Sequence, residues 1–445
     1  MEKFFKLKEH GTDARTEVTA GITTFLAMVY ILAVNPSILS ATGMDSSAVF
    51  TATAISAAFA TLIMAFYANY PVALASGMGL NVYFAFSVCS PMARDGIQDP
   101  WKIALAAVLC EGIIFILLSF TNFREKLVND IPENLKYGIT AGIGLFIAIV
   151  GLKGAGIVIA DPSTLVTLGK LGSPQFVLAF IGLIVIAILN HYKVKGDILI
   201  GILVTWILGI IAQQTGWYHV DPTNGVNSLL PSFKGGFFPA KMNIFSFDFD
   251  WIGKHIIDFA IIVFSFLFVD IFDTVGTLIG VASKGNLLDE NGDLPRAKQA
   301  LLADALGTVA GACIGTSTVT SYVESSAGVA AGGRTGLTSL VTAVLFILSL
   351  FLSPIFLAIP GFATTPALLW VGLLMVSAIK NMKFDGDLAE VVSGFLAIVM
   401  MPFTYSIANG IMFGMLSWVI LKLFTGKFKE INIIMWICFV LFLLR

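Results

Sequence analysis

The segment FSFLFVDIFDTVGTLIG, residues 264–280, decides the fold class of this chain. It is apolar enough to cross a lipid bilayer, yet it carries two aspartates, Asp270 and Asp273, near its middle. A carboxylate at the bilayer centre costs about 2.5–3.5 kcal/mol on insertion scales, so an acid inside a membrane segment indicates function. The two aspartates are three residues apart, and this spacing predicts that they share one face of a helix.

The composition of the whole chain favours a membrane setting for this segment. Of the 445 residues, 57% are hydrophobic and only 12% are charged, and the mean hydropathy is +0.90. Water-soluble domains usually carry about 25% charged residues, so this chain has too little polar surface to cover soluble cores of its size. A formal net charge of -2 provides no basic field for nucleic acid. The composition therefore predicts an all-α polytopic protein of the lipid bilayer that binds no nucleic acid.

A helix needs about 20 mostly apolar residues to cross a bilayer. Applied along the chain, this window predicts fourteen transmembrane segments: residues 18–35, 48–70, 72–89, 102–121, 134–152, 175–191, 196–214, 258–280, 299–314, 316–332, 336–358, 366–382, 388–405 and 406–424. A further apolar run at 430–444 is short for a span. The sequence leaves open whether this run spans the membrane, lies at its surface or packs against the bundle.

The Lys and Arg residues set the orientation of these segments. With the N-terminus inside, eighteen of the 26 basic residues fall on the cytoplasmic side and seven fall outside, and Arg445 is assigned to neither side. An excess of basic residues on the inner side is the rule for membrane proteins. The first residues also lack the apolar core of a cleaved signal peptide, so we expect the N-terminus to be retained and cytoplasmic.

The longest extramembrane stretch, roughly 215–256, divides seven spans from seven. Since seven is an odd number, the two halves must cross the membrane in opposite directions. This is the pattern of an inverted-repeat transporter. The prediction rests on the span count and on the position of unusual segments, because the halves have no evident sequence similarity.

The third and the tenth segments read as poor continuous helices. ALASGMGLNVYFAF (73–86) contains glycines and Asn81, and STVTSYVESSAGVAAGG (317–333) opens with β-branched and hydroxyl residues and contains Glu324. Non-helical backbone survives at membrane depth only where it lines a cavity or is buried in protein. We therefore predict a short β-strand and a helix in each segment, with the helix N-terminus turned to the midplane.

These segments together predict one binding site. Its polar members are Asp270, Asp273, Glu324 and Asn81. Because no basic residue lies in either acid-bearing run, a water-accessible cavity is favoured over buried ion pairs. Carboxylates beside an amide and free backbone N–H groups suit a small, flat, neutral ligand with N–H donors along its edges. Phe25, Phe84 and Phe272 are candidates to stack on such a ring. The alternatives are that an aspartate caps a broken helix and that small residues such as Gly328 and Gly332 serve helix packing.

At these residues the sequence resembles the AzgA-like purine permeases, a branch of the nucleobase:cation symporter group that also holds the uracil and xanthine/uric acid permeases. The resemblance covers nearly the whole chain. Five motifs carry it in order: GITTFLAMVYILAVNP (21–36), ASGMGLNVYFAF (75–86), FVDIFDTVGTLIG (268–280), GTSTVTSYVESSAGVAAGGRTGLTS (315–339) and MPFTYSIANGI (401–411). Span eight departs from the uracil and xanthine branches, which carry glutamate where this chain carries aspartate.

The resemblance implies a fold of two inverted repeats with seven spans each. Spans one to four and eight to eleven would form a core domain, and the remaining spans would form a gate domain. The expected boundaries are 14–130 and 257–360 for the core, 131–216 and 361–424 for the gate, 217–256 for an extracellular connector and 425–445 for a C-terminal hydrophobic segment. Related permeases pair through their gate domains, which suggests a homodimer in the cell (inner) membrane.

The resemblance also implies an activity: uptake of the purine nucleobases adenine, guanine and hypoxanthine with protons, as the core moves past the gate like an elevator. Such a protein is a secondary active transporter and not an enzyme, and it needs no cofactor or metal. Alignment of DTVG with the ExxG of related permeases favours Asp273 as substrate contact and Asp270 as proton-linked or structural partner. Asp270, Asp273 and Glu324 are the expected proton-coupling residues, because an apolar cavity favours the neutral form of a carboxyl group.

The expected substrate-binding set joins the polar members of the site to their neighbours on the same segments. It comprises Thr24, Phe25, Gly79, Asn81, Asp270, Phe272, Asp273, Thr274, Gly276, Thr277, Tyr322, Val323, Glu324 and Ser325.

The sequence leaves three alternatives open. A xanthine- or uracil-type substrate, or sodium in place of the proton, is compatible with the same fold. Anion exchange would use the helix dipoles alone, but three acids would repel an anion. An intramembrane aspartyl protease would need its two acids on different helices, whereas Asp270 and Asp273 share one.

Overall fold

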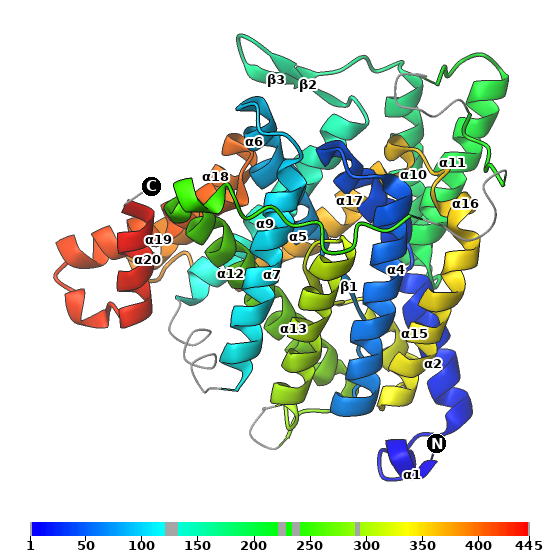
Figure 1. Cartoon of the computed structure of the whole chain (residues 1–445), viewed down its shortest axis with the longest axis horizontal. Coiled ribbons are helices and arrows are strands. Elements are labelled where there is room, and N and C mark those ends of the chain that lie inside the picture. Colours follow the sequence, from blue (N-terminus) through cyan, green and yellow to red (C-terminus); the bar gives the residue numbers. More distant parts are fainter. Residues whose placement is uncertain (1, 121–131, 221–227, 234–240, 290–293, 444–445) are drawn as a thin grey trace.

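The computed structural model describes residues 2–120, 132–220, 228–233, 241–289 and 294–443. This part of the chain is a bundle of helices with two small two-stranded sheets (Figure 1). The mostly helical architecture with short strands in the third and tenth segments agrees with the prediction.

Nine helical stretches among the described residues are long and apolar enough to cross a membrane. They are α2 (Ala14–Met28) with α3 (Ile31–Leu39), α4 (Ser46–Ile63), α7 (Pro100–Ser119), α9 (Glu133–Gly154), α10 (Pro174–His191), α11 (Asp197–Gln214), α15 (Gly336–Ser349) with α16 (Ser353–Phe356), α17 (Gly361–Val376) and α19 (Ile407–Phe424). The chain is therefore a multi-pass membrane protein.

The other five predicted segments have counterparts of different character. Three are the acid-bearing helix α12 (Ile256–Gly285), α13 (Ala297–Ile314) and the shorter α18 (Leu388–Thr404). The last two are the broken segments, each with a strand and a short helix: β1 (Leu74–Ser76) with α5 (Met78–Val82), and β4 (Val319–Ser321) with α14 (Ser325–Ala330). The fourteen-segment prediction is compatible with this arrangement.

The two strands of the broken segments pair with each other at the centre of the bundle. β1 and β4 run antiparallel, with Ala75 opposite Thr320. Two hydrogen bonds extend the ladder, from the Gly77 N–H to the Thr318 carbonyl and from the Tyr322 N–H to the Ala73 carbonyl, both at 3.0 Å. Pairing satisfies backbone groups that no water would reach at this depth. The antiparallel direction is what two segments of opposite orientation produce.

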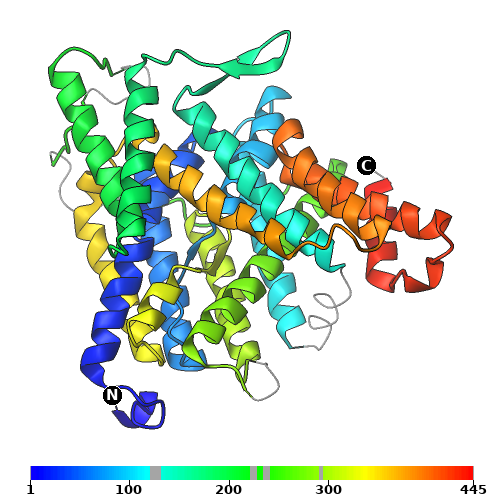
Figure 2. The same cartoon turned by 180° about the vertical axis from the view of Figure 1, so that it is seen from behind.

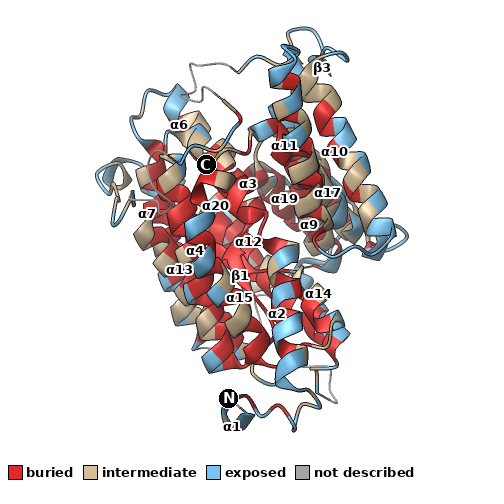
Figure 3. Cartoon of the chain, turned by 90° about the vertical axis from the view of Figure 1, so that its right-hand side faces the viewer, coloured by how far each residue is buried: buried red, intermediate tan, exposed pale blue. Residues whose placement is uncertain are grey.

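The helices pack as two groups. In one group α4 and α13 lie at the centre and contact each other. α4 also packs against α15, and α13 packs against α7. α2 packs against α14 and α15. In the other group α9 packs against α17, α18 and α19, and α10 and α11 pack on α17. Figure 3 views both groups from the side, with the buried residues concentrated where they meet.

Glycines allow the second group to pack closely. A Cβ at Gly144 on α9 would lie 2.7 Å from the carbonyl oxygen of Gly372 on α17, and a Cβ at Gly372 would lie 2.7 Å from the carbonyl oxygen of Gly144. Only residues without a side chain permit this mutual approach, which is a common way to pack membrane helices.

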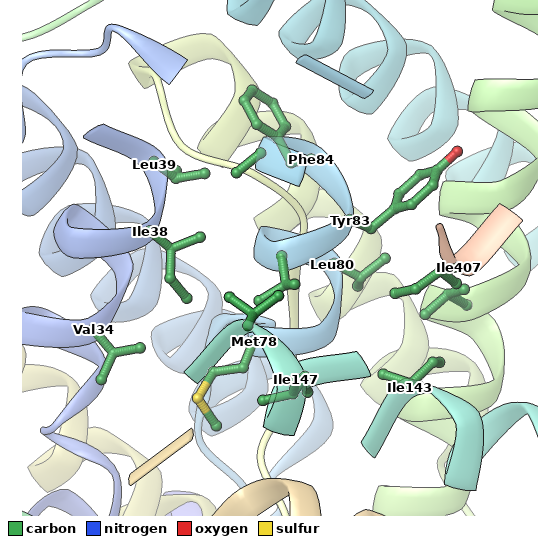
Figure 4. Packing of buried hydrophobic residues seen from close by; sticks show 14 of the residues in the cluster. Val34, Ile38, Leu39, Met78, Leu80, Tyr83, Phe84, Ile143, Ile147 and Ile407 are labelled. Atoms are coloured by element: carbon green, nitrogen blue, oxygen red, sulfur yellow. The ribbon is translucent and has the colours of Figure 1, made fainter. Parts of the chain in front are cut away.

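Apolar side chains form the contact between the two groups beside the strand crossing. Met78 and Leu80 of α5 lie near Ile143 and Ile147 of α9 (Figure 4). A Cβ at Gly79 would lie 2.8 Å from the Ile143 side chain, so α5 and α9 touch closely there. No hydrogen bond is needed to hold such a surface, which leaves it free of directional contacts.

Short elements complete the described chain. They are α1 (Glu2–Phe5), a π-helix (Tyr83–Cys89) continuing into α6 (Ser90–Arg94), the hairpin β2 (Val158–Asp161) and β3 (Leu165–Leu168), and α20 (Ile433–Leu443). The N-terminal α1 and the hairpin lie at opposite ends of the bundle (Figures 1 and 2). The predicted domain boundary at 130/131 falls in a stretch outside the described residues.

The C-terminal run predicted at 430–444 forms a short helix against the bundle. α20 has 11 residues, too few to cross a bilayer at 1.5 Å per residue. It packs on α19 and α12, and the Phe442 ring meets the Phe264 ring edge-on at 5.9 Å. Of the three placements that the sequence left open, packing against the bundle is the one observed.

Candidate functional site

The two aspartates of α12 have different surroundings. Asp270 is 0% exposed, whereas Asp273 is half-buried. Gly276, one turn beyond Asp273, is exposed, and a Cβ added there would have no neighbour within 4 Å. Residues three apart point about 60° from each other around a helix. This rotation turns Asp270 into the protein and leaves Asp273 at an accessible surface, so the expectation that both face one water-accessible cavity is wrong for Asp270.

Glu324 stands at the accessible surface as well. It is the residue immediately before α14, and it is half-buried, while its neighbour Val323 is 49% exposed. The Tyr30 hydroxyl donates a hydrogen bond of 2.5 Å to Glu324 Oε1. α12 packs against α14, and Asp273 and Glu324 are close enough for their charges to interact. Two carboxyl groups from different elements therefore meet at one surface.

Asn81 supports the strand crossing, and both ends of its side-chain amide have hydrogen-bond partners there. It is fully buried, its Nδ2 donates to the Ser76 carbonyl over 3.4 Å, and its Oδ1 accepts from the Ser317 hydroxyl. Both ends of the amide thus join β1 and α5 to the residues before β4. The amide has a structural role here, and its expected contact with substrate stays a prediction.

A buried polar network fixes the same crossing to the first span. Asn35 of α3 donates to Thr53 Oγ1 over 2.7 Å and to Thr316 Oγ1 over 2.9 Å. The Ser76 hydroxyl lies 3.0 Å from Thr316 Oγ1. The Tyr322 hydroxyl donates to the Ser76 carbonyl over 2.5 Å, and it lies within electrostatic range of Glu324 and Asp273.

Other members of the expected substrate-binding set have internal partners. Thr274 is buried and bonds Asp304 Oδ1 over 2.8 Å and Thr320 Oγ1 over 2.7 Å. The Ser325 hydroxyl accepts the Ala73 N–H over 3.0 Å, and the Ser325 N–H donates to the Tyr322 carbonyl over 3.1 Å. The expectation of free backbone N–H groups at the start of this helix is therefore wrong for Ser325. The tight turn from β4 into α14 uses that group.

The remaining members lie around the two carboxyl groups or in packing contacts. Thr24 is buried against α14, where a Cβ at Gly328 would overlap its hydroxyl oxygen. Phe25 and Phe272 are half-buried, and their rings lie 5.4 Å from Phe346 and 4.6 Å from Phe268 respectively. Thr277 is buried on α12, and Gly79 packs on α9. Phe84 is fully buried, so it is not placed to stack on a ligand in this structure.

Three residues at or beside the candidate site were not predicted from the sequence. Tyr30 lies in an apolar run, where nothing marks it as the partner of Glu324. Glu111 on α7 and Asp304 on α13 are fully buried beside Asp270. The rule that selected Asp270, an acid within an apolar span, applies equally to these two and would have found them. In the described part of the chain no group of three His, Cys, Asp or Glu residues is arranged to hold a metal ion.

Comparison with known proteins shows the family of the chain. A profile described as "Permease family", of the xanthine/uracil permease type, matches residues 15–427. The chain is 44% identical to the adenine permease AdeP of Escherichia coli over 445 residues, which cover 100% of this chain and 95% of that protein. It is 46% identical to the guanine/hypoxanthine permease PbuO of Bacillus subtilis over 443 residues, with 99% of each chain covered.

Solved structures agree on the fold. The transmembrane domain of the cyanobacterial bicarbonate transporter BicA superposes with a TM-score of 0.66 at 15% sequence identity, covering 89% of this chain and 97% of that one. At this identity the likeness concerns the fold alone. A permease profile over nearly the whole chain, transporter relatives of matching length and a transporter fold agree with one another. The chain belongs to the permease family, and it is a membrane transporter and not an enzyme.

Proposed function

We propose that this chain takes up purine nucleobases together with protons across the cell membrane. The observation that carries the proposal is the pair of half-buried carboxyl groups, Asp273 and Glu324, contributed by α12 and by the start of α14. The relatives described as adenine and guanine/hypoxanthine permeases support the choice of adenine, guanine and hypoxanthine.

The chemistry of the pair suits a purine. A purine presents ring N–H groups and exocyclic amines along its edges, and carboxylate oxygens accept hydrogen bonds from such donors. Phe25 and Phe272, half-buried on α2 and α12, are the aromatic residues proposed to stack on its ring. The Tyr30 hydrogen bond holds Glu324 in one orientation, so the acceptor is positioned before the ligand arrives.

The movement proposed is an elevator. The core domain would comprise residues 14–130 and 257–360, and the gate domain residues 131–216 and 361–424. The apolar contact of α5 with α9 would form part of the sliding surface, because it carries no directional bonds that must break (Figure 4). In this scheme the N-terminus is cytoplasmic, and two copies pair through their gate domains.

Anion transport is the competing function because BicA, a bicarbonate transporter by title, shares the fold. The carboxyl groups of Asp273 and Glu324 oppose it, since like charges at close range repel. A xanthine- or uracil-type substrate is a further competitor, and only measurement of uptake distinguishes it.

The test is uptake of labelled hypoxanthine by cells that lack their own nucleobase permeases and express this chain. Unlabelled adenine or guanine should compete, a protonophore should abolish accumulation, and replacement of sodium should have no effect. The proposal fails if uracil or xanthine is the effective competitor, if excess sulfate or bicarbonate inhibits, or if uptake follows sodium.

A further inference from the structure

A second group of acids lies behind the proposed substrate site. Glu111 on α7, Asp270 on α12 and Asp304 on α13 are each fully buried, and their carboxyl groups lie within electrostatic range of one another. The three helices are neighbours in the bundle (Figure 1), and Gly112, where a Cβ would lie 2.8 Å from Val309, lets α7 approach α13 beside Glu111.

The oxygens of this group are not equally satisfied. Asp304 Oδ1 accepts from the Thr274 hydroxyl over 2.8 Å and from the Ser321 hydroxyl over 3.3 Å. By contrast, both carboxyl oxygens of Glu111 and both of Asp270 are buried with no N–H or O–H donor of another residue beside them. Leaving a buried charged acceptor unpaired is costly, so an additional donor must be present.

The helices that carry the three acids supply no basic donor from their apolar runs. The apolar runs that carry the three acids, residues 103–119, 256–283 and 299–314, contain no Lys, Arg or His. Asp273 is a further charged group near Asp270. Glu324 in turn interacts with Asp273. The charged groups that interact with Glu111 and Asp270 are thus acids, and adjacent acids in a low-dielectric interior cannot all be ionised.

We propose that Glu111 and Asp270 share a proton and form the proton-carrying site of this transporter, separate from the Asp273–Glu324 pair that meets the substrate. One carboxyl group then donates to the other, so one of the two unpaired oxygens of each group gains a partner. This inference rests on the proposed function, because it assigns the site where the coupled proton travels. The proton binds from the outside water and is released to the inside, and no covalent bond is made or broken.

The position of the pair links it to the substrate site. Asp270 lies one helical turn before Asp273, a rise of about 4.5 Å along α12. On the other side, Asp304 is joined through Thr274 and Ser321 to β4, and β4 leads directly to Glu324. A change in the charge of the buried group therefore acts on both elements that carry the substrate carboxyl groups.

The first test detects the proton without any substrate. Infrared absorption of the purified protein at neutral pH should contain a protonated carboxyl stretch that both Glu111→Gln and Asp270→Asn remove or shift. Glu133→Gln, an exposed acid at the start of α9, is the matched control and should leave the spectrum unchanged. An identical carboxyl stretch in wild type, Glu111→Gln and Asp270→Asn would overturn the proposal, whatever the protein transports.

The second test separates coupling from binding. The amide introduced by Glu111→Gln can donate an N–H to Asp270 and so imitates the protonated pair, and the variant should fold and still exchange labelled hypoxanthine across proteoliposomes. Accumulation driven by an imposed pH gradient should fall by about tenfold or more, since the proton no longer leaves. Wild-type accumulation by Glu111→Gln contradicts the inference. Failure of the wild-type protein to exchange hypoxanthine contradicts the proposed function instead. In that case only the infrared experiment tests whether Glu111 and Asp270 share a proton.

Discussion

Tyr30 of the first span donates a 2.5 Å hydrogen bond to Glu324, which lies 294 residues later at the start of α14. The bond joins two segments that are adjacent only in the folded protein. It fixes one of the two proposed substrate carboxyl groups and leaves the other, Asp273, to be positioned by α12 alone.

We expect Tyr30→Phe to weaken substrate binding without loss of fold. The change keeps the ring and removes the donor, and a hydrogen bond to a charged group is worth about 1.5–3 kcal/mol, so KM for purine uptake should rise about tenfold. Tyr322→Phe is the matched control, because its hydroxyl bonds the Ser76 carbonyl. Tyr322→Phe should lower the melting temperature and leave KM close to its wild-type value. A wild-type KM in Tyr30→Phe would contradict the role given to this bond.

We expect Gly144→Ala and Gly372→Ala each to destabilise the protein. The added methyl group would lie 2.7 Å from the facing carbonyl oxygen, and such overpacking costs about 1–3 kcal/mol. Gly280→Ala is the control, since no atom lies within 4 Å of a Cβ there and alanine favours a helix by roughly 0.5–1 kcal/mol. Melting of the detergent-purified variants measures both effects. Equal melting temperatures for all three variants would show that α9 and α17 are not packed as described.

We expect the stability contributed by Asp387 to vanish in acid. Hydrogen bonds from Lys422 at 2.6 Å and Lys427 at 2.9 Å hold the pKa of the Asp387 carboxyl well below its ordinary value of 3.8. A pKa lowered by folding stabilises the protein above the unfolded-state pKa, and that stability is lost as the pH falls through the folded-state pKa.

Asp387→Asn tests this pH dependence. It keeps an acceptor for the Ala389 N–H at the start of α18 and removes the charge. At neutral pH its melting temperature should be about 1–3 °C below wild type, because partly exposed ion pairs are weak. The difference should shrink as the pH falls below about 4 and vanish only near the folded-state pKa, well below the ordinary value of 3.8. A difference in melting temperature that grows on acidification would have the opposite sign and would rule out a stabilising role for the Asp387 charge.

The sequence predicts the fold well because the bilayer restricts it. Apolar runs in the chain reappear as helices, and the two segments with the residues least suited to helix contain β1 and β4. What the sequence could not predict is the partner of each polar side chain. Asn81, Thr274 and Ser325 look like ligand contacts by type, and in the fold their hydrogen bonds serve the strand crossing.

The division between Asp270 and Asp273 has a similar cause. A spacing of three residues specifies nearly the same face of a helix, but the rotation of about 60° between them decides which one is covered by α7 and α13. Packing between these distant segments also brings Glu111 and Asp304 close to Asp270.

The most direct test of the central claim, that Asp273 and Glu324 bind the purine, is accumulation of labelled hypoxanthine by Asp273→Asn and Glu324→Gln variants whose presence in the membrane has been verified. Each replacement keeps the shape of the side chain and removes its charge. Both variants should lose accumulation against a gradient, while Glu133→Gln keeps it. If either variant accumulates hypoxanthine as wild type does, the assignment of that carboxyl group to the substrate is wrong.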